Sequence, residues 1–125
     1  QSPMNDIEDL DYDADGFADI VSRDNRYHAR AYTLLADVIR YLSSEHGHIK
    51  ADEILDEFKE RALDLFGPMT YTVLTAWGLK ETADIGEMML NLVESGRIGR
   101  DEDDNIDDFA NGYEFKEAFL GPYEI

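Results

Sequence analysis

The stretch that decides the fold is residues 82–96, which read TADIGEMMLNLVESG. Apolar residues recur in it at spacings of three and four, which predicts one buried stripe on an amphipathic helix: Ile85, Met88, Met89, Leu92 and Val93. We expect Thr82 to cap this helix and Gly96 to end it. Gly86, inside the helix, costs about 1 kcal/mol relative to alanine, so it predicts close approach by a neighbouring helix.

Glycines at helix-ending positions likewise predict three further helices before this one. They run from about 27 to 46, from 51 to 66, and from Pro68 through Trp77, and they end near Gly47, Gly67 and Gly78. We expect Trp77 to be a buried core residue. The expected buried positions of the two longer helices are Ala31, Leu34, Leu35, Val38, Ile39, Tyr41 and Leu42, then Ile54, Leu55, Phe58, Ala62, Leu65 and Phe66.

The two ends of the chain have weaker patterns. Near the start, the apolar cluster at 17–21 predicts one or two helical turns. After Gly96, the segment 97–100, an acidic run through Asp108 and the alternation at 113–115 predict a β-hairpin with a long acidic tip. Residues 105–109 are also compatible with a helical turn inside that loop.

Together these elements predict a mainly α, single-domain helical fold with a winged-helix-like C-terminal half and a small β-hairpin. We expect residues 1–16 to form a flexible acidic tail, residues 17–120 to form the domain and residues 121–125 to form a short tail. The match to a winged helix rests on the order of elements and carries no function.

Negative charge is concentrated at the two ends. The net charge is −18, divided as −7 over residues 1–20, −3 over 21–100 and −8 over 101–125. A field of this sign repels phosphate backbones and anionic lipids and attracts basic protein surfaces or cations. It argues against nucleic acid or a membrane as a direct partner.

The chain has no cysteine, which removes disulfides and thiolate zinc sites from consideration. No apolar run approaches the roughly 20 residues that span a bilayer. We therefore expect a cytoplasmic protein.

A series of short strings gives the chain a resemblance that no single string carries. The strings are Asp24-Asn25-Arg26-Tyr27, Ala31-Tyr32, Phe66-Gly67-Pro68-Met69, Val73-Leu74, Trp77-Gly78, Asp84-Ile85-Gly86-Glu87, Asn91-Leu92-Val93-Glu94-Ser95-Gly96, Asp107-Asp108-Phe109 and Tyr113-Glu114-Phe115. In them the chain resembles, over about residues 17–119, an uncharacterised family of small bacterial proteins largely restricted to planctomycetes and verrucomicrobia. The resemblance implies a stand-alone bacterial protein and no activity. Lys50 departs from that pattern, in which a small hydroxyl residue would cap helix 51–66.

One segment fits part of a calcium-binding loop. Asp11, Asp13, Asp15 and Asp19, with Gly16, occupy positions 1, 3, 5, 9 and 6 of an EF-hand-like loop, where carboxylates converge on Ca²⁺. Position 12 is Ser22 in place of the usual bidentate glutamate. The alternative is a solvated acidic tail, with no cofactor at all.

Other site patterns are weaker. Asp101, Asp103, Asn105 and Asp107 alternate in the same way, but Ile106 stands where the loop glycine is required. His46 and His48 are compatible with a metal site and equally with a helix-ending turn. The sequence contains no nucleophile elbow and no phosphate-binding glycine motif.

These observations favour a non-enzymatic, acidic protein-protein interaction module that binds a basic protein surface. An acidic decoy that mimics nucleic acid and an enzyme of unrecognised type are the alternatives. DNA binding through helix 82–95 is not expected, because its apolar stripe must face the core, which would turn acidic and polar positions outward: Asp84, Glu87, Asn91 and Glu94.

Overall fold

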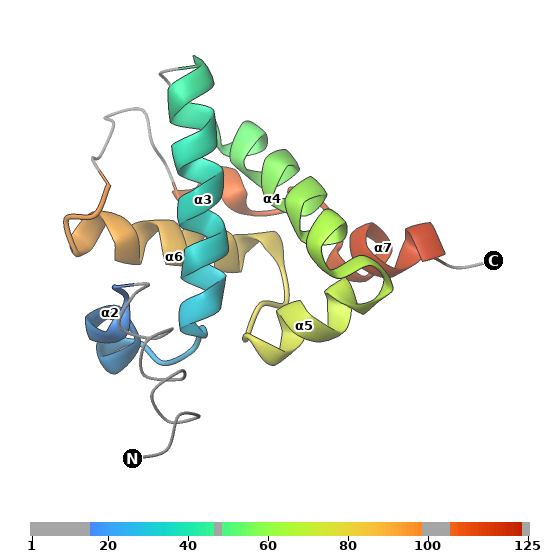
Figure 1. The fold of residues 1–125 in the computed structure, drawn as a ribbon, viewed down its shortest axis with the longest axis horizontal. Helices are drawn as coiled ribbons and strands as arrows, with labels where there is room; N and C mark the ends of the chain where they lie inside the picture. The colour runs from blue at the N-terminus through green and yellow to red at the C-terminus, as the bar shows by residue number, and fades with distance from the viewer. Residues whose placement is uncertain (1–15, 47–48, 99–105, 124–125) are drawn as a thin grey trace, which may run out of the picture.

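A computed structural model describes residues 16–46, 49–98 and 106–123, and all its regular elements are helical (Figure 1). The α-helices are α2 (Ala18–Arg23), α3 (Ala29–His46), α4 (Ala51–Phe66), α5 (Thr70–Ala76), α6 (Thr82–Glu94) and α7 (Phe115–Leu120). The short 3-10 helices are η1 (Gly67–Met69), η2 (Ile106–Phe109) and η3 (Gly121–Tyr123).

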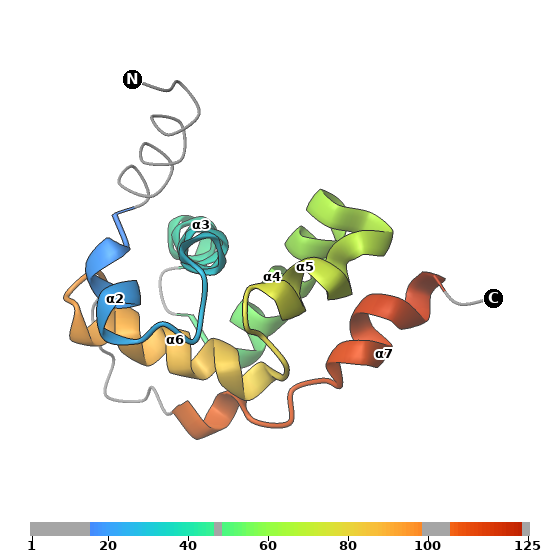
Figure 2. The same cartoon turned by 90° about the horizontal axis from the view of Figure 1, so that it is seen from below.

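Helix α3 is the centre of the arrangement. It runs beside α4 and crosses α6, and the view along its axis shows α6 passing beneath it (Figure 2). Ala31, Leu35, Val38 and Leu42 recur at spacings of three and four, and each is at most 5% exposed. This stripe meets the buried faces of α4 and α6, so the helices share one apolar core.

The predicted boundaries of the long helices are largely confirmed. Helix α4 has the predicted bounds, and α6 ends within a residue of the expected position. Gly67, Gly78 and Gly96 all have positive φ angles, as expected at helix-ending turns. Gly47 lies outside the described residues.

The amino-terminal cap predicted for α6 is wrong. Glu81 is the N-cap residue, and Thr82 is a buried first helical residue whose hydroxyl accepts a hydrogen bond from the Gly112 N–H at 3.0 Å. The carboxylate of Asp84, in the first turn, accepts from the N–H groups of Lys80 and Glu81. Helix α4 begins in a similar way. Its N-cap residue, Lys50, offers no capping side chain, and the Glu53 side chain accepts a hydrogen bond from the Lys50 N–H at 3.1 Å.

The predicted β-hairpin is wrong, since no strand occurs within 16–46, 49–98 or 106–123. The alternation at 113–115 leads instead into α7, whose N-cap residue Glu114 accepts hydrogen bonds from the backbone of Lys116 and Glu117. Phe115 and Phe119, four residues apart, are both buried, which is a helical period. The C-terminal half therefore lacks the strands of a winged-helix fold in the described residues, and the alternative helical turn at 105–109 is confirmed as η2.

Gly86 has the packing role that the sequence predicts, although a 3-10 helix fills the space. A Cβ atom on Gly86 would lie 2.9 Å from the Cβ of Phe109 and 3.1 Å from the carbonyl oxygen of Ile106. Glycine therefore lets η2 lie directly on α6.

Two residues predicted to be buried are exposed. Tyr41 is 46% exposed and Leu65 is 60% exposed. The next residue in each helix, Leu42 or Phe66, lies in the core or packs against it, so the two exposed residues lie at the edges of their apolar stripes. Trp77 is half-buried and packs edge to face on Phe66, with ring centroids 5.4 Å apart. No helix in the described ranges combines the length and apolar character needed to cross a membrane.

Candidate functional site

A group of seven interacting polar side chains joins α6 to the α2–α3 loop and the start of α3. We call it the α6 polar cluster. Its members are Asp24, Arg26, Tyr27, Tyr32, Asp84, Glu87 and Asn91.

One half of the cluster is centred on the Asp24 carboxylate. Arg26 binds it with two nitrogens, Nε at 2.9 Å from Oδ1 and Nη2 at 2.7 Å from Oδ2. The Asn91 amide donates to the same carboxylate at 3.0 Å and contacts the buried Tyr32 hydroxyl at 2.9 Å. The hydrogen bonds from Arg26, with a smaller contribution from Asn91, hold the pKa of Asp24 well below its usual range.

The other half of the cluster is centred on the Asp84 carboxylate. The hydroxyl of Tyr27 donates to Asp84 Oδ1 at 2.6 Å, and the backbone bonds from Lys80 and Glu81 occupy Oδ2. Burial, together with the bond to Asp84, raises the pKa of Tyr27 far above its ordinary value. Arg26 connects the two halves through a 3.2 Å ion pair with Glu87.

These protonation states indicate a structural role for the cluster. A general acid or base needs a pKa near the working pH, whereas Asp24 stays ionised and Tyr27 stays protonated across the neutral range. The loops around the cluster are tightly packed, because a Cβ on Gly78 would overlap the carbonyl oxygen of Arg26. We conclude that the cluster anchors the α2–α3 loop to α6.

The prediction that α6 presents its polar side chains to solvent is wrong for Asp84 and Asn91, which are partly buried against the α2–α3 loop and the start of α3. Glu87 has a side chain 40% exposed, although it pairs with Arg26, and Glu94 is exposed. The partners lie 57 to 67 positions apart in the chain, so helical periodicity contained no signal for them.

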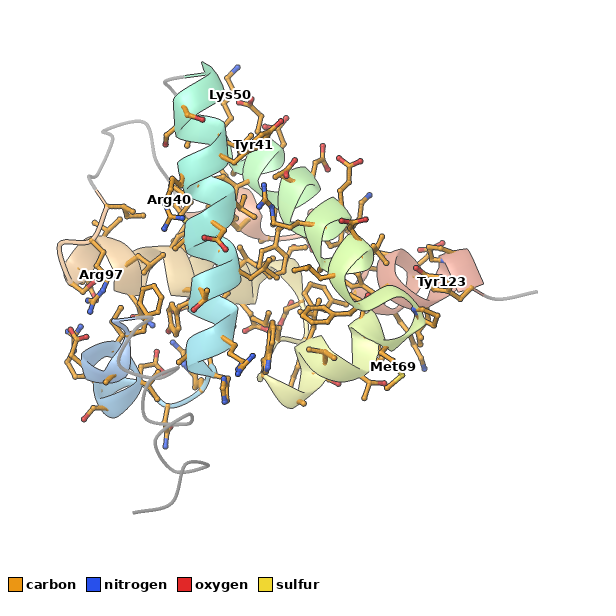
Figure 3. All side chains as sticks on the ribbon, in the orientation of Figure 1. Arg40, Tyr41, Lys50, Met69, Arg97 and Tyr123 are labelled. Carbon is orange, nitrogen blue, oxygen red and sulfur yellow. The ribbon has the colours of Figure 1, made fainter. Side chains whose placement is uncertain are left out.

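The predicted calcium loop falls mostly outside the described residues, which exclude Asp11, Asp13 and Asp15. Asp19 lies in the first turn of α2, where Arg97 binds its carboxylate at 2.6 Å and, mainly through this bond, lowers the pKa of Asp19. Arg97, which is labelled in Figure 3, also donates to the Gly16 carbonyl and lies over the Phe17 ring. The one predicted ligand that can be placed is therefore already paired with a cation.

The other predicted metal patterns likewise find no support where the chain is described. In the described ranges, no three His, Asp or Glu side chains are grouped so that they could hold a metal ion. His48, Asp101, Asp103 and Asn105 lie outside those ranges. His28 stacks on Trp77 with ring centroids 6.4 Å apart, and its Nδ1 accepts a hydrogen bond from the Arg30 N–H.

A different arrangement occurs on the solvent side of α4, where exposed acids form what we call the acid row: Asp52, Asp56, Glu60 and Asp64. Their spacing of four residues repeats about every 6 Å along a helix. Among the described residues, Asp56, Glu60 and Asp64 make no ion pair, unlike the neighbouring Glu57, which Arg61 binds at 3.0 Å. Asp52, in the first turn of α4, accepts a hydrogen bond from the Glu53 N–H at 2.9 Å and is favourably placed at the helix N-terminus. Like charges four residues apart destabilise a helix slightly, so Asp56, Glu60 and Asp64 do not stabilise α4 by their interactions with one another.

The acid row leads to a group of exposed apolar side chains that we call the apolar end. It consists of Leu65, Met69 and Tyr123, exposed by 60%, 57% and 43%. The Tyr123 hydroxyl lies 4.0 Å from the position that a Cβ on Gly67 would take, so η3 and η1 are neighbours. Figure 3 shows Met69 and Tyr123 at the same end of the molecule.

Comparisons of the chain with protein-family models, curated proteins and solved structures gave no match.

Proposed function

We propose that this chain is a non-enzymatic interaction module that binds a basic surface of another protein. The observation that carries the proposal is the contrast between two sets of acids. In the α6 polar cluster, acids are paired with Arg26, Tyr27 and Asn91, whereas three acids of the α4 row are exposed and unpaired within the described residues. Charges that do not support the fold are available to a partner.

A net charge of −18 supports the same choice of partner. Long-range attraction would raise the rate of encounter with a basic protein, and it would repel nucleic acid and anionic membranes. A cytoplasmic location accompanies this proposal, since the chain contains no cysteine to be oxidised.

The test is capture on the immobilised chain at increasing salt, with beads carrying polyglutamate as the control for bulk charge. We expect at least one basic protein to bind the chain and not polyglutamate near physiological ionic strength, to elute at higher salt, and to bind again after purification. Retention no greater than on polyglutamate at every salt concentration would refute the proposal.

A second candidate is an acidic decoy that occupies a nucleic-acid-binding surface. The regular repeat of negative charge along a rigid helix favours it, because such surfaces are built to neutralise rows of phosphates. The captured protein distinguishes the two functions: duplex DNA should displace the chain from a nucleic-acid-binding protein, and it should not displace the chain from any other basic partner.

A further inference from the structure

The apolar end is a surface that folding leaves uncovered. Leu65, Met69 and Tyr123 come from three different elements, α4, η1 and η3, and each is more than two-fifths exposed. Figures 1 and 2 both place the α4–α5 junction beside the end of α7 and η3. Single exposed apolar residues are ordinary, whereas several at one place mark an interaction surface.

The negative charge of the acid row favours a partner surface that carries Lys or Arg. The row ends at Asp64, and Leu65 is the next residue, turned about 100° around α4, so the apolar surface lies to one side of the end of the row. Three steps of four residues cover about 18 Å. Residues four apart turn about 40° around a helix at each step, so a second α-helix that crosses α4 at an angle would bring its lysines or arginines, four residues apart, against the central acids of the row.

We propose that the acid row and the apolar end form one docking surface for a basic amphipathic helix of another protein. Its Lys or Arg side chains lie against the acid row, and apolar side chains beyond them pack on Leu65, Met69 and Tyr123. This inference rests on the proposed function and names the surface that performs it. A second copy of the chain is the wrong occupant, because it would bring a net charge of −18 against the same sign.

The probe is a synthetic, fluorescently labelled amphipathic peptide with four lysines at intervals of four residues and two leucines after them. A shuffled peptide of the same composition is its control. Fluorescence anisotropy at low ionic strength should show saturable binding of the ordered peptide to the full chain, and at least several-fold weaker binding of the shuffled one.

Paired variants then locate the surface. We expect Asp56→Asn with Glu60→Gln to weaken binding roughly three- to tenfold, as for two partly exposed ion pairs. Leu65→Ser with Met69→Ser should weaken it by a similar factor with little change in salt dependence. The matched control, Glu81→Gln with Glu94→Gln, removes the same charge from two exposed acids at the ends of α6 and should change affinity less than twofold. All these residues are exposed, and circular dichroism checks that each variant is folded.

Three results would overturn the docking surface. Equal weakening by the α4 and α6 charge variants would show attraction by total charge, which leaves the proposed function standing. Equal binding of the ordered and shuffled peptides, or no binding of either, would refute the helical partner while capture on the immobilised chain still tests the function independently. A concentration-dependent dimer abolished by Leu65→Ser with Met69→Ser would show that the apolar end binds a second copy.

Discussion

Replacing Asp24 by asparagine removes the charge at the centre of one half of the α6 polar cluster and keeps the shape of the side chain. The native carboxylate accepts hydrogen bonds from Nε and Nη2 of the Arg26 side chain, from the Arg26 backbone N–H and from the Asn91 amide. An asparagine at position 24 can keep one acceptor, and its NH₂ group would then face a donor. The variant therefore loses both the negative charge that pairs with Arg26 and part of the hydrogen-bonding arrangement around position 24.

The expected loss of stability is about 2 kcal/mol. Asp24 has a side chain 21% exposed and Arg26 one that is 53% exposed, so solvent screens the pair and it contributes about 0.5–1 kcal/mol. The bond from Asn91, which is also held by the buried Tyr32, adds about 1–1.5 kcal/mol as a hydrogen bond to a charged group.

Asp37→Asn is the matched control. Asp37 pairs with Arg40 at 2.9 Å on the surface of α3, where the two side chains are 42% and 76% exposed. Its replacement should cost less than about 0.5 kcal/mol. Urea unfolding followed by circular dichroism measures both variants, and equal losses would refute the view that the cluster anchors the α2–α3 loop.

The pH dependence gives an independent check. Because the pKa of Asp24 is lower in the folded state than in the unfolded state, its contribution is complete above the unfolded value of about 3.9 and is lost as the pH falls through the folded value. The difference in unfolding free energy between the native chain and Asp24→Asn should be constant from about pH 5 to 8 and shrink below about pH 4. A difference that grows below pH 4 would contradict the assignment.

Four further predictions follow from single contacts. Gly86→Ala gains about 1 kcal/mol of helix propensity but forces Phe109 off α6, so we expect a net destabilisation of about 0.5–2 kcal/mol in urea; stabilisation would show that η2 yields freely. Trp77→Ala should cost roughly 1.5–3 kcal/mol in the same assay, less than full burial would give, and a loss below about 1 kcal/mol would contradict its packing on Phe66. If Asp19 completes a calcium site it must leave Arg97, so Arg97→Gln should tighten Ca²⁺ binding in calorimetry, and no saturable heat from either chain would eliminate the site. Random duplex DNA at low salt should give no anisotropy change up to tens of micromolar, since the polar flank of α6 is already occupied by the α2–α3 loop; micromolar binding would refute this.

Helix positions could be predicted because the signals are local. Apolar spacing and a glycine turn define α4 and α6 without reference to any other part of the chain. After Gly96 the local signals mislead. Three alternating residues at 113–115 predict a strand, whereas the buried residues Phe115 and Phe119 lie four positions apart, which is the period of a helix.

Burial was harder to predict than helix type, because a periodic pattern does not show where covering elements stop. Leu65 and Tyr41 belong by spacing to apolar stripes, yet each lies at the edge of its stripe, next to a residue that packs in or against the core, Phe66 and Leu42. Their exposure depends on how far around each helix the neighbouring elements reach, which other segments determine. The apolar end could therefore not be found from sequence.

The opposite error concerns polar residues, and it bears on function. Asp84, Glu87 and Asn91 have the composition of a solvent-exposed face, but they are held by partners about 60 positions earlier in the chain. Asp56, Glu60 and Asp64 have a similar composition and no ion pair in the described residues. Sequence cannot separate these sets, because the difference is whether a cationic or hydroxyl partner is folded against them. In an acidic chain, the acids paired inside the fold stabilise it, and a continuous run of acids unpaired within the described part of the chain, such as Asp56, Glu60 and Asp64 on α4, is available to a partner.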